Sequence, residues 1–338
     1  MKILTPVSGN PWAVPDCYYR GLVNAGADVA AYDIGEAPAS LAGRILLRLR
    51  RLAGSVAAKT LERAVAAEKP DVLIVFKGFD YPPALLRKIA ARGIHLVNYN
   101  PDHPFRFFLS GAGNANVRDS IPAYRLYFTY SGPIGREMRE AYPDLPVAVL
   151  PFGHAVDDAL HDELASEPEV LRGCFNANPD EDRAAAVRLL IENGVAMDLF
   201  GWGWEKFLTP GPMLGIYPVE RGTDMLRILR RYRFQLNMFR PHNEGSHNLR
   251  SFEVPAVGGI LLAPDSPEHR DFFVADRDAF YFATPAEMLA KAQRLLAMPA
   301  AEADEVRASA RRRTVEIESH FDDRARAMLA EIRRVIVA

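Results

Sequence analysis

Short apolar runs alternate with helix-like segments along the whole chain, and this alternation constrains the fold more than any other feature of the sequence. The run Asp71–Phe76, which reads DVLIVF, is typical of a strand buried on both faces of a parallel sheet. It is followed by the stretch Lys77–Asp80, which reads KGFD, and by a helix predicted at Pro82–Arg92, which is the order of a βαβ unit. We therefore predict an α/β fold built from Rossmann-like, doubly wound parallel sheets.

The length of the chain predicts two domains, because 338 residues exceed what one hydrophobic core usually spans. The acidic stretch Asp157–Glu169 lacks a regular apolar period and indicates a linker. The predicted N-terminal domain covers residues 1–155, the linker residues 156–170 and the C-terminal domain residues 171–320. We expect the two domains to face each other across a cleft, and residues 321–338 to form a helix that can pack back on the N-terminal domain.

The composition argues against several classes of protein. A formal net charge of −2 disfavours a nucleic-acid-binding protein, which normally carries a basic excess. Two cysteines are too few for a disulfide framework or a zinc cluster, and they fit a reducing compartment. No apolar run is long enough to span a membrane, and Met1–Pro6 begins a strand rather than a signal peptide. We therefore expect a cytoplasmic protein.

One predicted helix is basic and is compatible with contact with a membrane surface. The segment Ser40–Glu68 is predicted to be helical, with an apolar face and a cluster of arginines beside it. The cluster consists of Arg44, Arg48, Arg50 and Arg51. Such a helix can lie on the inner face of an anionic membrane or bind a charged acceptor molecule. The alternative is that its charges form a face exposed only to solvent.

Polar residues follow the first strand, where open α/β sheets place their ligands. Ser8, Gly9 and Asn10 lie in this loop, which is not a GxGxxG fingerprint and gives little support for a dinucleotide site. A simple Pro/Gly turn and a ligand-binding loop are both open interpretations.

A second polar strand end carries candidates for acid/base chemistry. Asp102 and His103 follow the strand predicted at His95–Tyr99, and a strand end with both residue types can position an acid and a base. The alternative is that Asp102 only caps the turn after Pro101.

The second half of the chain repeats the pattern of strands and helices. One strand is predicted to end at Asn176 and another to run into Gly201. Glycines directly after a strand let a ligand approach the backbone, although they can also serve a tight turn. The four residues from Asn178 match the start of a helix, with Asn178 as the N-cap and Glu181 completing a capping box. The stretch Asp180–Asp182 superficially resembles a metal-binding DxD, but its position favours capping, and no metal site is predicted.

The stretch Gly245–Leu262 reads GSHNLRSFEVPAVGGILL and is predicted to be a short helix ended by a diglycine and followed by a buried strand. Glu253 sits among hydrophobic neighbours on this helix. A carboxylate in that setting needs a partner, because burying an unpaired charge is costly. A polyol such as a ribose would supply paired hydroxyl donors, so we predict that Glu253 binds one.

Several segments together resemble a known family. DVLIVFKG, LVNYNPDHP and VLPFGHAVD occur in the first half, and CFNANPDEDRAAAVRLLIENGVAMDLFGWGW begins the second. The most specific segments are NLRSFEVPAVGGILL and FVADRDAFYFATPAEML, and SHFDDRARAMLAEI resembles the closing helix. The sequence resembles glycosyltransferases of GT-B architecture, most closely the spore-maturation-protein-B-like (CgeB-type) group. The resemblance covers most of the chain and is concentrated after residue 171.

The resemblance implies that a nucleoside-diphosphate sugar is held mainly by the C-terminal domain and an acceptor mainly by the N-terminal domain. Glu253 matches the glutamate that binds the ribose hydroxyls in related transferases. Those relatives often carry an earlier glutamate in an E-x7-E spacing, where this chain has Gly245, with Glu244 one residue away. Tyr217 lies in the segment that meets the nucleobase.

The remaining donor-binding residues are expected around this helix and at the strand ends. Arg250 and Asn248 stand near the helix start, where backbone N–H groups and the helix dipole favour phosphate. The other residues in the expected donor site are Asn176, Gly201, Ser8, Gly9, Asn10 and His154.

The implied reaction needs negative charge to be stabilised on the departing diphosphate. Without a DxD, this role falls to Arg250, a helix N-terminus and Lys77 or His154, so we predict transfer without a metal or other cofactor. An inverting enzyme would also need a base near the acceptor hydroxyl, and Asp102 or His103 is the best candidate. The acceptor can be a protein, a lipid-linked glycan or a small molecule.

Two other functions fit the same architecture. One is a sugar-nucleotide epimerase, which would form product without an acceptor. The other is a sugar-nucleotide or glycan-binding protein without catalysis. A solute-binding protein is disfavoured by the missing signal peptide, and an NAD-dependent dehydrogenase by the missing GxGxxG.

Overall fold

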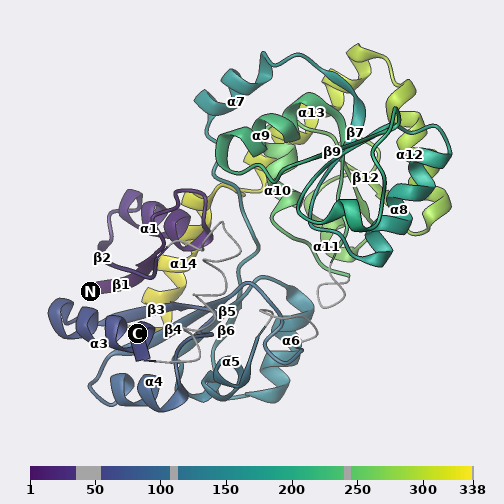
Figure 1. The fold of residues 1–338 in the computed structure, drawn as a ribbon. Coiled ribbons are helices and arrows are strands. Elements are labelled where there is room, and N and C mark those ends of the chain that lie inside the picture. The colour runs from purple at the N-terminus through teal and green to yellow at the C-terminus, as the bar shows by residue number, and fades with distance from the viewer. Residues whose placement is uncertain (36–54, 107–112, 240–244, 337–338) are drawn as a thin grey trace. The chain divides into compact units, whose positions relative to one another are not determined.

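The computed structural model describes residues 1–35, 55–106, 113–239 and 245–336, which form two compact units. Unit 1 contains Met1–Phe152 and the chain from Phe321 onward, and unit 2 lies within Gly153–His320. Each unit has one parallel sheet flanked by helices (Figure 1). The predicted α/β fold with two doubly wound domains is therefore confirmed.

Unit 1 is built on a six-stranded parallel sheet with the order β2-β1-β3-β4-β5-β6. The strands are β1 (Lys2–Val7), β2 (Asp28–Asp33), β3 (Val72–Phe76), β4 (His95–Asn100), β5 (Leu126–Thr129) and β6 (Val147–Val149). The helices are α1 (Val14–Asn24), α3 (Ser55–Glu68), α4 (Pro83–Ala90), α5 (Ala115–Asp119), α6 (Gly132–Ala141) and α14 (Phe321–Ile336). The strand order reverses between β1 and β3, and ligands of open α/β sheets bind beside such a point, at the carboxyl ends of the strands.

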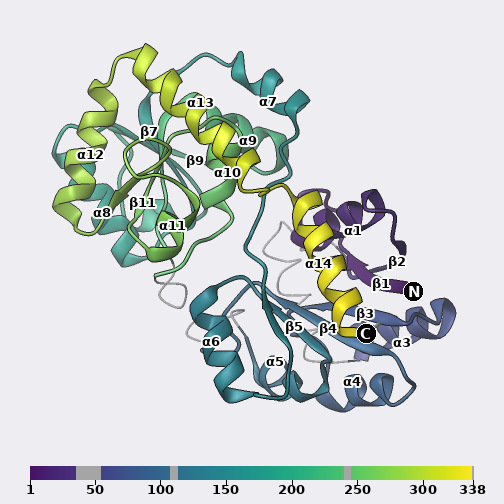
Figure 2. The same cartoon turned by 180° about the vertical axis from the view of Figure 1, so that it is seen from behind.

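The helix α14 belongs to unit 1 because it packs directly on α1, as Figures 1 and 2 both show. The two helices approach so closely at Gly21 that a Cβ there would lie 2.6 Å from Cβ of Ala325. The ring centroids of Tyr18 and Phe321 are 5.4 Å apart, and both side chains are buried. Apolar contact along this face therefore ties a segment distant in sequence to the start of the chain.

Unit 2 has a six-stranded parallel sheet with the order β12-β11-β10-β7-β8-β9. The strands are β7 (Val170–Asn176), β8 (Met197–Phe200), β9 (Leu214–Tyr217), β10 (Tyr232–Leu236), β11 (Leu261–Pro264) and β12 (Phe280–Phe282). The helices are α7 (Asp158–Ala165), α8 (Glu181–Glu192), α9 (Gly222–Arg231), α10 (Arg250–Ala256), α11 (Pro267–Phe272), α12 (Pro285–Ala297) and α13 (Ala300–Glu316). The order of the strands reverses between β7 and β10, which places the expected ligand crevice at the carboxyl ends of these two strands.

One predicted segment differs from the structure, and the C-terminal part of the chain contains a break between two helices. Residues 156–170, predicted to be a linker, contain α7, whose first turn is capped by the Asp157 carboxylate accepting from the Leu160 N–H at 2.8 Å. The helix α13 ends at Glu316, and Glu318 has a positive φ of 49° that an α-helix cannot contain. The interruption separates α13 from α14.

The predicted capping box after β7 is wrong in its details. The N-cap of α8 is Asp180, whose carboxylate accepts from the Arg183 N–H at 2.9 Å, so the helix begins two residues later than predicted. The Asn178 side chain instead accepts a hydrogen bond from the Trp202 N–H at 3.2 Å. The predicted capping role of the acidic stretch is therefore filled by Asp180.

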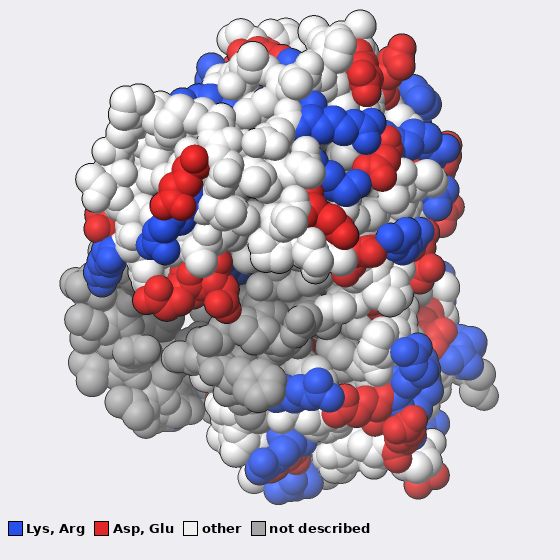
Figure 3. All heavy atoms as spheres, turned by 90° about the vertical axis from the view of Figure 1, so that its right-hand side faces the viewer, with Lys and Arg blue, Asp and Glu red and all other residues white. Residues whose placement is uncertain are grey.

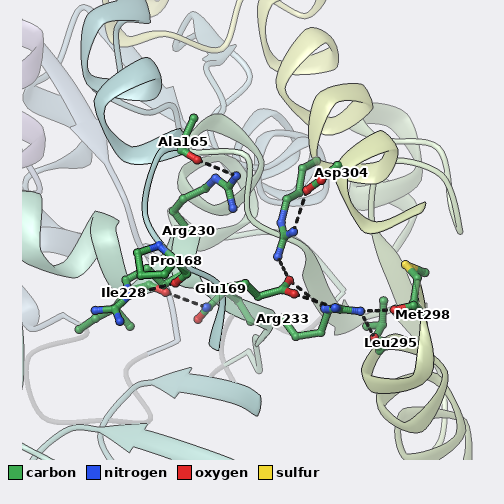
Figure 4. A network of polar contacts seen from close by, with 12 residues as sticks. Ala165, Pro168, Glu169, Ile228, Arg230, Arg233, Leu295, Met298 and Asp304 are labelled. Atoms are coloured by element: carbon green, nitrogen blue, oxygen red, sulfur yellow. Dashed lines mark hydrogen bonds and ion pairs between the residues drawn. The ribbon is translucent and has the colours of Figure 1, made fainter. Parts of the chain in front are cut away.

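A polar network anchors the centre of the second sheet (Figure 4). Glu169, just before β7, accepts hydrogen bonds from Arg233 of β10 at 2.7 and 2.9 Å and from Arg307 of α13. Burial raises the pKa of Glu169, but the hydrogen bonds from the two arginines outweigh it and hold the pKa below its usual value. Arg233 also donates to the carbonyls of Leu295 and Met298, which satisfies the end of α12.

The predicted basic helix can be compared with the structure only in part, because some of its residues are not described. The arginine cluster of the basic helix lies outside the described residues, which include only the end of that segment, as α3. Among the helices that the structure describes, none has the length and apolar character needed to cross a bilayer. On the face drawn in Figure 3, acidic and basic side chains are interspersed, and neither sign forms an extended patch.

Candidate functional site

The carboxyl edge of the second sheet brings three predicted regions into one row. In the sheet register, Asn176 at the end of β7 pairs with Phe200 of β8, which pairs with Tyr217 of β9. On the other side of β7 runs β10, whose following residue Asn237 exchanges side-chain hydrogen bonds with Asn248 at 2.9 and 3.1 Å. Residues up to 72 positions apart in the chain therefore share one edge of the same sheet.

A pocket of about 380 Å³ opens at the ends of β8 and β9. Its lining consists of Gly201, Trp202, Gly203, Glu205, Ile216, Tyr217 and Pro218. The side chains of Trp202 and Tyr217 are large and apolar but 40% and 43% exposed. The Tyr217 ring stacks on Phe200 with centroids 5.1 Å apart and planes inclined by 20°. Exposed aromatic surface beside a concavity suits a planar ring of a ligand.

The glycines of this pocket have structural reasons to be glycine. A Cβ on Gly201 would lie 2.1 Å from the Ala177 carbonyl oxygen, which also accepts a hydrogen bond from Trp204 Nε1 at 2.8 Å. Gly203 has a φ of 94°, which an L side chain rarely adopts. Of the two possibilities left open by the sequence, the tight turn and close backbone packing explain both glycines without a ligand.

Arg183 holds the loop after β7 to the end of β10. Its guanidinium donates to the carbonyl of Asn178 at 2.9 Å and to the carbonyl of Met238 at 3.2 Å. The side chain also lies over the Phe175 ring, 5.8 Å from its centroid. The two strand ends that flank the reversal of strand order are thus fixed to each other by one buried arginine.

The helix α10 begins at this edge, and Asn248 organises its start. The Asn248 side chain accepts from the Ser251 N–H at 3.2 Å, while the Asn248 N–H donates to Ser251 Oγ at 3.1 Å. This reciprocal pair satisfies backbone groups of the first turn, and the hydrogen bonds to Asn237 tie the turn to β10. Asn248 therefore has a structural role at the position predicted to bind the donor.

Glu253 has a protein partner. Its carboxylate forms an ion pair with Arg250 one turn earlier in α10, and the two side chains are 16% and 25% exposed. Arg250 therefore supplies the partner that this carboxylate needs, so its burial alone does not require the hydroxyls of a ligand. Both side chains remain partly accessible at the carboxyl edge, and the ribose contact of Glu253 stays a prediction that rests on the resemblance.

Gly245 has a conformational reason to replace the expected glutamate. Its φ is 77°, in the left-handed region that favours glycine, although a Cβ there would meet no atom within 4 Å. The backbone conformation, rather than a lack of room for a side chain, therefore favours glycine at this position. A glutamate would have to adopt a strained backbone to stand here.

A buried polar network supports the loop that contains Gly245. The Glu268 carboxylate accepts from Ser246 Oγ and lies 2.9 Å from His247 Nδ1, and His247 is fully buried. His269 is also fully buried: its Nδ1 lies 2.9 Å from the Pro264 carbonyl and its Nε2 2.8 Å from Ser251 Oγ. A carbonyl only accepts, so Nδ1 of His269 carries the hydrogen and Nε2 accepts from the serine. Apart from the polar residues themselves, no pattern in the sequence indicates this network.

The burial of His269 predicts that acid destabilises unit 2. Burial lowers the pKa of His269 to about 4, below the ordinary value of 6.5, although the hydrogen bond to Pro264 opposes the shift. The unfolded chain therefore binds a proton that the folded chain does not between these two pH values. We expect this group to reduce the free energy of unfolding by about 3 kcal/mol between pH 7 and pH 4. Urea unfolding followed by circular dichroism measures the loss.

The matched variant for this test is His269→Gln, which retains one donor and one acceptor but does not titrate in this range. Its unfolding should depend less on pH than that of the wild-type protein between pH 7 and about pH 4. An equal pH dependence in the two proteins would assign the acid sensitivity to other groups.

In unit 1, the predicted residue Asp102 lies beside a lysine at the carboxyl edge of the sheet. Asp102 Oδ2 is 2.6 Å from Lys77 Nζ, and both side chains are partly exposed. Lys77 has a positive φ of 62°, a conformation that is uncommon for a non-glycine residue and often found at functional sites. The Asp102 N–H donates to Asn100 Oδ1 at 3.0 Å, which fixes the turn after β4. Both the turn role and a chemical role are thus compatible with this geometry.

His103 is more enclosed than its neighbour. It is 4% exposed, its Nδ1 accepts from the Phe105 N–H at 3.2 Å, and its Nε2 lies 3.2 Å from the Glu137 carboxylate. Both ring nitrogens are therefore engaged inside unit 1. Of the two residues predicted for acid/base chemistry, Asp102 has the more accessible reactive atoms.

The loop with Ser8, Gly9 and Asn10 is organised by Asp16, a residue that was not predicted to belong to the site. The buried Asp16 carboxylate accepts from the Ser8 N–H at 2.9 Å, from Ser8 Oγ at 2.8 Å and from the Gly9 N–H at 3.0 Å. The N–H groups of Ser8 and Gly9 thus already donate within the protein. The feature of the sequence that could have identified Asp16 is an acidic residue in the first turn of the helix that follows a strand.

His154 lies in unit 2, next to its boundary. It is 2% exposed, its N–H donates to the Ser319 carbonyl at 3.1 Å, and its Nδ1 accepts from the Val156 N–H at 3.2 Å. Its ring packs edge-on to His320, with centroids 5.3 Å apart. The residue joins the two ends of unit 2, and its predicted contact with the donor stays a prediction.

Comparison with known proteins gives one family match. Residues 183–330 match the model of a family described as glycosyl transferase-like. No curated protein gives a significant match to the sequence.

Solved structures of low sequence identity share the fold over the whole chain. Sucrose-phosphate synthase from Thermosynechococcus elongatus aligns with a TM-score of 0.71 at 10% identity, covering 100% of this chain and 99% of that chain. A glycosyltransferase from Rickettsia africae gives 0.62 at 10% identity, covering 99% and 98%. UDP-GlcNAc 2-epimerase from Neisseria meningitidis, solved with UDP-GlcNAc bound, gives 0.59 at 12% identity, covering 99% and 100%. The chain therefore has the two-domain GT-B fold, and its residues 183–330 are similar to a family described as glycosyl transferase-like.

Proposed function

We propose that the protein is a glycosyltransferase that moves a sugar from a nucleoside-diphosphate sugar to an acceptor hydroxyl. The observation that carries the proposal is the carboxyl edge of the second sheet, where the pocket beside Tyr217 and the ion pair Arg250–Glu253 lie on the same unit. This edge falls within the part of the chain that matches the glycosyl transferase-like family.

The proposed roles follow the order of groups in a nucleoside diphosphate. The base packs on Tyr217 in the pocket, and Glu253 accepts hydrogen bonds from the ribose hydroxyls. Asn176 lies between these positions in the row of strand ends, and its Nδ2 is buried with no hydrogen-bond partner among the described residues. That N–H₂ group is a donor suited to a ribose or phosphate oxygen.

The chemistry requires charge stabilisation and, for an inverting reaction, a base. Arg250 and the first turn of α10 are proposed to face the diphosphate, where a guanidinium and backbone N–H groups stabilise developing negative charge. In unit 1, Asp102 is the proposed base for the acceptor hydroxyl. We further propose membership of the CgeB-type group and a cytoplasmic location, both on the resemblance and composition given above.

A donor screen tests the function directly. Thermal stabilisation by UDP-, GDP- and dTDP-sugars, followed by release of nucleoside diphosphate from each, should identify at least one donor. If no nucleotide sugar stabilises or reacts with the protein, the proposal is wrong.

The same screen separates transfer from two alternatives. The match in fold to an epimerase that binds UDP-GlcNAc favours sugar-nucleotide epimerisation as the second candidate. An epimerase would convert the donor to an isomeric nucleotide sugar without any acceptor. A binding protein without catalysis would show stabilisation by the donor and no turnover.

We predict that transfer or donor hydrolysis survives treatment with EDTA. The acidic stretch that resembles a DxD caps α8 through Asp180, and charge stabilisation is assigned to Arg250 instead. Activity should therefore change less than twofold after chelation and dialysis, a difference of about 0.4 kcal/mol. A loss that magnesium or manganese restores would contradict metal independence.

A further inference from the structure

The pocket at the ends of β8 and β9 contains one charged side chain, and that charge is negative. Glu205 lies in the single-turn helix η2 (Trp204–Lys206) and lines the pocket together with Trp202 and Tyr217. The Glu205 side chain has no hydrogen-bond or ion-pair partner among the residues that the structure describes. A carboxylate that lines a pocket without a protein partner has its hydrogen-bonding capacity available to a ligand.

The backbone around Glu205 offers few donors to compete with it. The Gly201 N–H donates to the Tyr217 carbonyl at 3.2 Å, and the Trp202 N–H donates to Asn178 Oδ1 at 3.2 Å. Pro218 has no N–H at all. Three of the lining residues therefore present no free backbone donor, and Glu205 is the charged acceptor of the pocket.

A carboxylate discriminates between nucleobases because it only accepts hydrogen bonds. Guanine presents two neighbouring donors on one edge, the ring N1–H and the exocyclic N2–H₂, which match the two oxygens of one carboxylate. Uracil and thymine present a single N–H between two carbonyl oxygens, and these oxygens would face the negative charge. Adenine and cytosine place an amino group next to a ring nitrogen that accepts. Guanine is thus the base whose edge satisfies both carboxylate oxygens.

The shape of the pocket agrees with such a base. Trp202 and Tyr217 expose aromatic surface beside Glu205, and the stacking of Tyr217 on Phe200 holds the tyrosine ring in place. A purine packed on this surface would exclude water from the carboxylate, which strengthens charge-assisted hydrogen bonds.

We propose that the donor is a guanosine-diphosphate sugar and that Glu205 recognises guanine through N1–H and N2–H₂. This inference rests on the proposed nucleotide-sugar function and narrows its donor to one nucleobase. A base without the paired donors leaves at least one carboxylate oxygen unpaired on binding, which is the arrangement that gives strong discrimination.

Calorimetric titration with GDP, IDP, UDP and ADP tests the inference on the full-length protein. IDP is identical to GDP except for the missing 2-amino group. The wild-type protein should bind GDP at least about tenfold more tightly than it binds IDP or UDP. Neither IDP nor UDP can donate the second hydrogen bond to the carboxylate, and a hydrogen bond to a charged group is therefore lost. Glu205→Gln should weaken the binding of GDP by about tenfold or more, and it should bind UDP at least as tightly as the wild-type protein does, because the amide removes the charge that faces the uracil oxygens.

Glu192→Gln is the matched control, because Glu192 is an exposed carboxylate at the end of α8 and outside the pocket. It should bind GDP like the wild-type protein. Tighter binding of UDP or ADP than of GDP, or an unchanged GDP affinity in Glu205→Gln, would overturn the guanine assignment and leave the nucleotide-sugar function intact. Failure of all four nucleotides to bind would overturn both.

Discussion

Replacement of Asp102 by asparagine is expected to slow release of nucleoside diphosphate from the donor by about 10²–10⁴-fold, the usual contribution of a general base. Asparagine has nearly the same shape but cannot accept the proton of an attacking hydroxyl. The affinity for the nucleotide should stay unchanged, because that site is assigned to unit 2 and Asp102 belongs to unit 1. Turnover at saturating donor and calorimetric affinity measure the two effects separately.

Two control variants separate the chemical role of Asp102 from its structural one. Asp102 pairs with Lys77 at 2.6 Å, so an effect of Asp102→Asn through the lost ion pair should be reproduced by Lys77→Met. Glu137→Gln removes the partly exposed carboxylate beside His103 Nε2 and tests whether that contact matters for turnover. Equal losses of turnover and affinity in Asp102→Asn, with a lowered melting temperature, would show a structural role instead.

The second large effect is expected from Glu253→Gln, which should weaken nucleoside-diphosphate binding by about 10- to 100-fold. A carboxylate that accepts from two ribose hydroxyls contributes charge-assisted hydrogen bonds of about 1.5–3 kcal/mol each, and an amide retains only part of this. The substitution also removes the charge that pairs with Arg250. The expected result is a weaker affinity for every nucleoside diphosphate, whatever its base.

The design of this test depends on the ion pair in α10. Arg250→Lys keeps a positive charge beside Glu253 but lacks the planar fork of donors. It should therefore lower the affinity for a nucleoside diphosphate more than the affinity for the nucleoside alone. Glu253→Gln should lower the affinity for the nucleoside as well, since the nucleoside and the nucleoside diphosphate both contain the ribose. Unchanged affinity of Glu253→Gln for both ligands would reject the ribose role.

The sequence predicted the sheets because buried parallel strands are apolar along their whole length. Val72–Phe76 and Leu261–Pro264 lie in apolar runs that could be found in the sequence, and Lys77 directly follows the first of them. The end of a helix is harder to predict than its existence. Asn178 and Asp180 are both good N-caps, and in the structure Asp180 caps α8 while Asn178 accepts from the N–H of Trp202, 24 residues away.

The partners of the candidate residues were less predictable than the residues themselves. The pair Arg250–Glu253 is one helical turn apart and could have been found from spacing once the helix was assigned. The pair Lys77–Asp102 depends instead on the register of β3 against β4, which aligns Phe76 with Tyr99. Sequence alone does not contain that register, and so the predicted site lacked its lysine contact.

The packing of α14 on α1 has a consequence for the order in which a ribosome can complete this protein. Unit 2 lies between Gly153 and His320 and emerges in one continuous stretch. Unit 1 emerges first, but the buried face of α1 around Tyr18 and Gly21 is covered only when residues 321–336 have been made. Domains usually complete folding in the order of their synthesis. Here the unit that begins the chain waits for its last helix, and the inserted unit can finish before it.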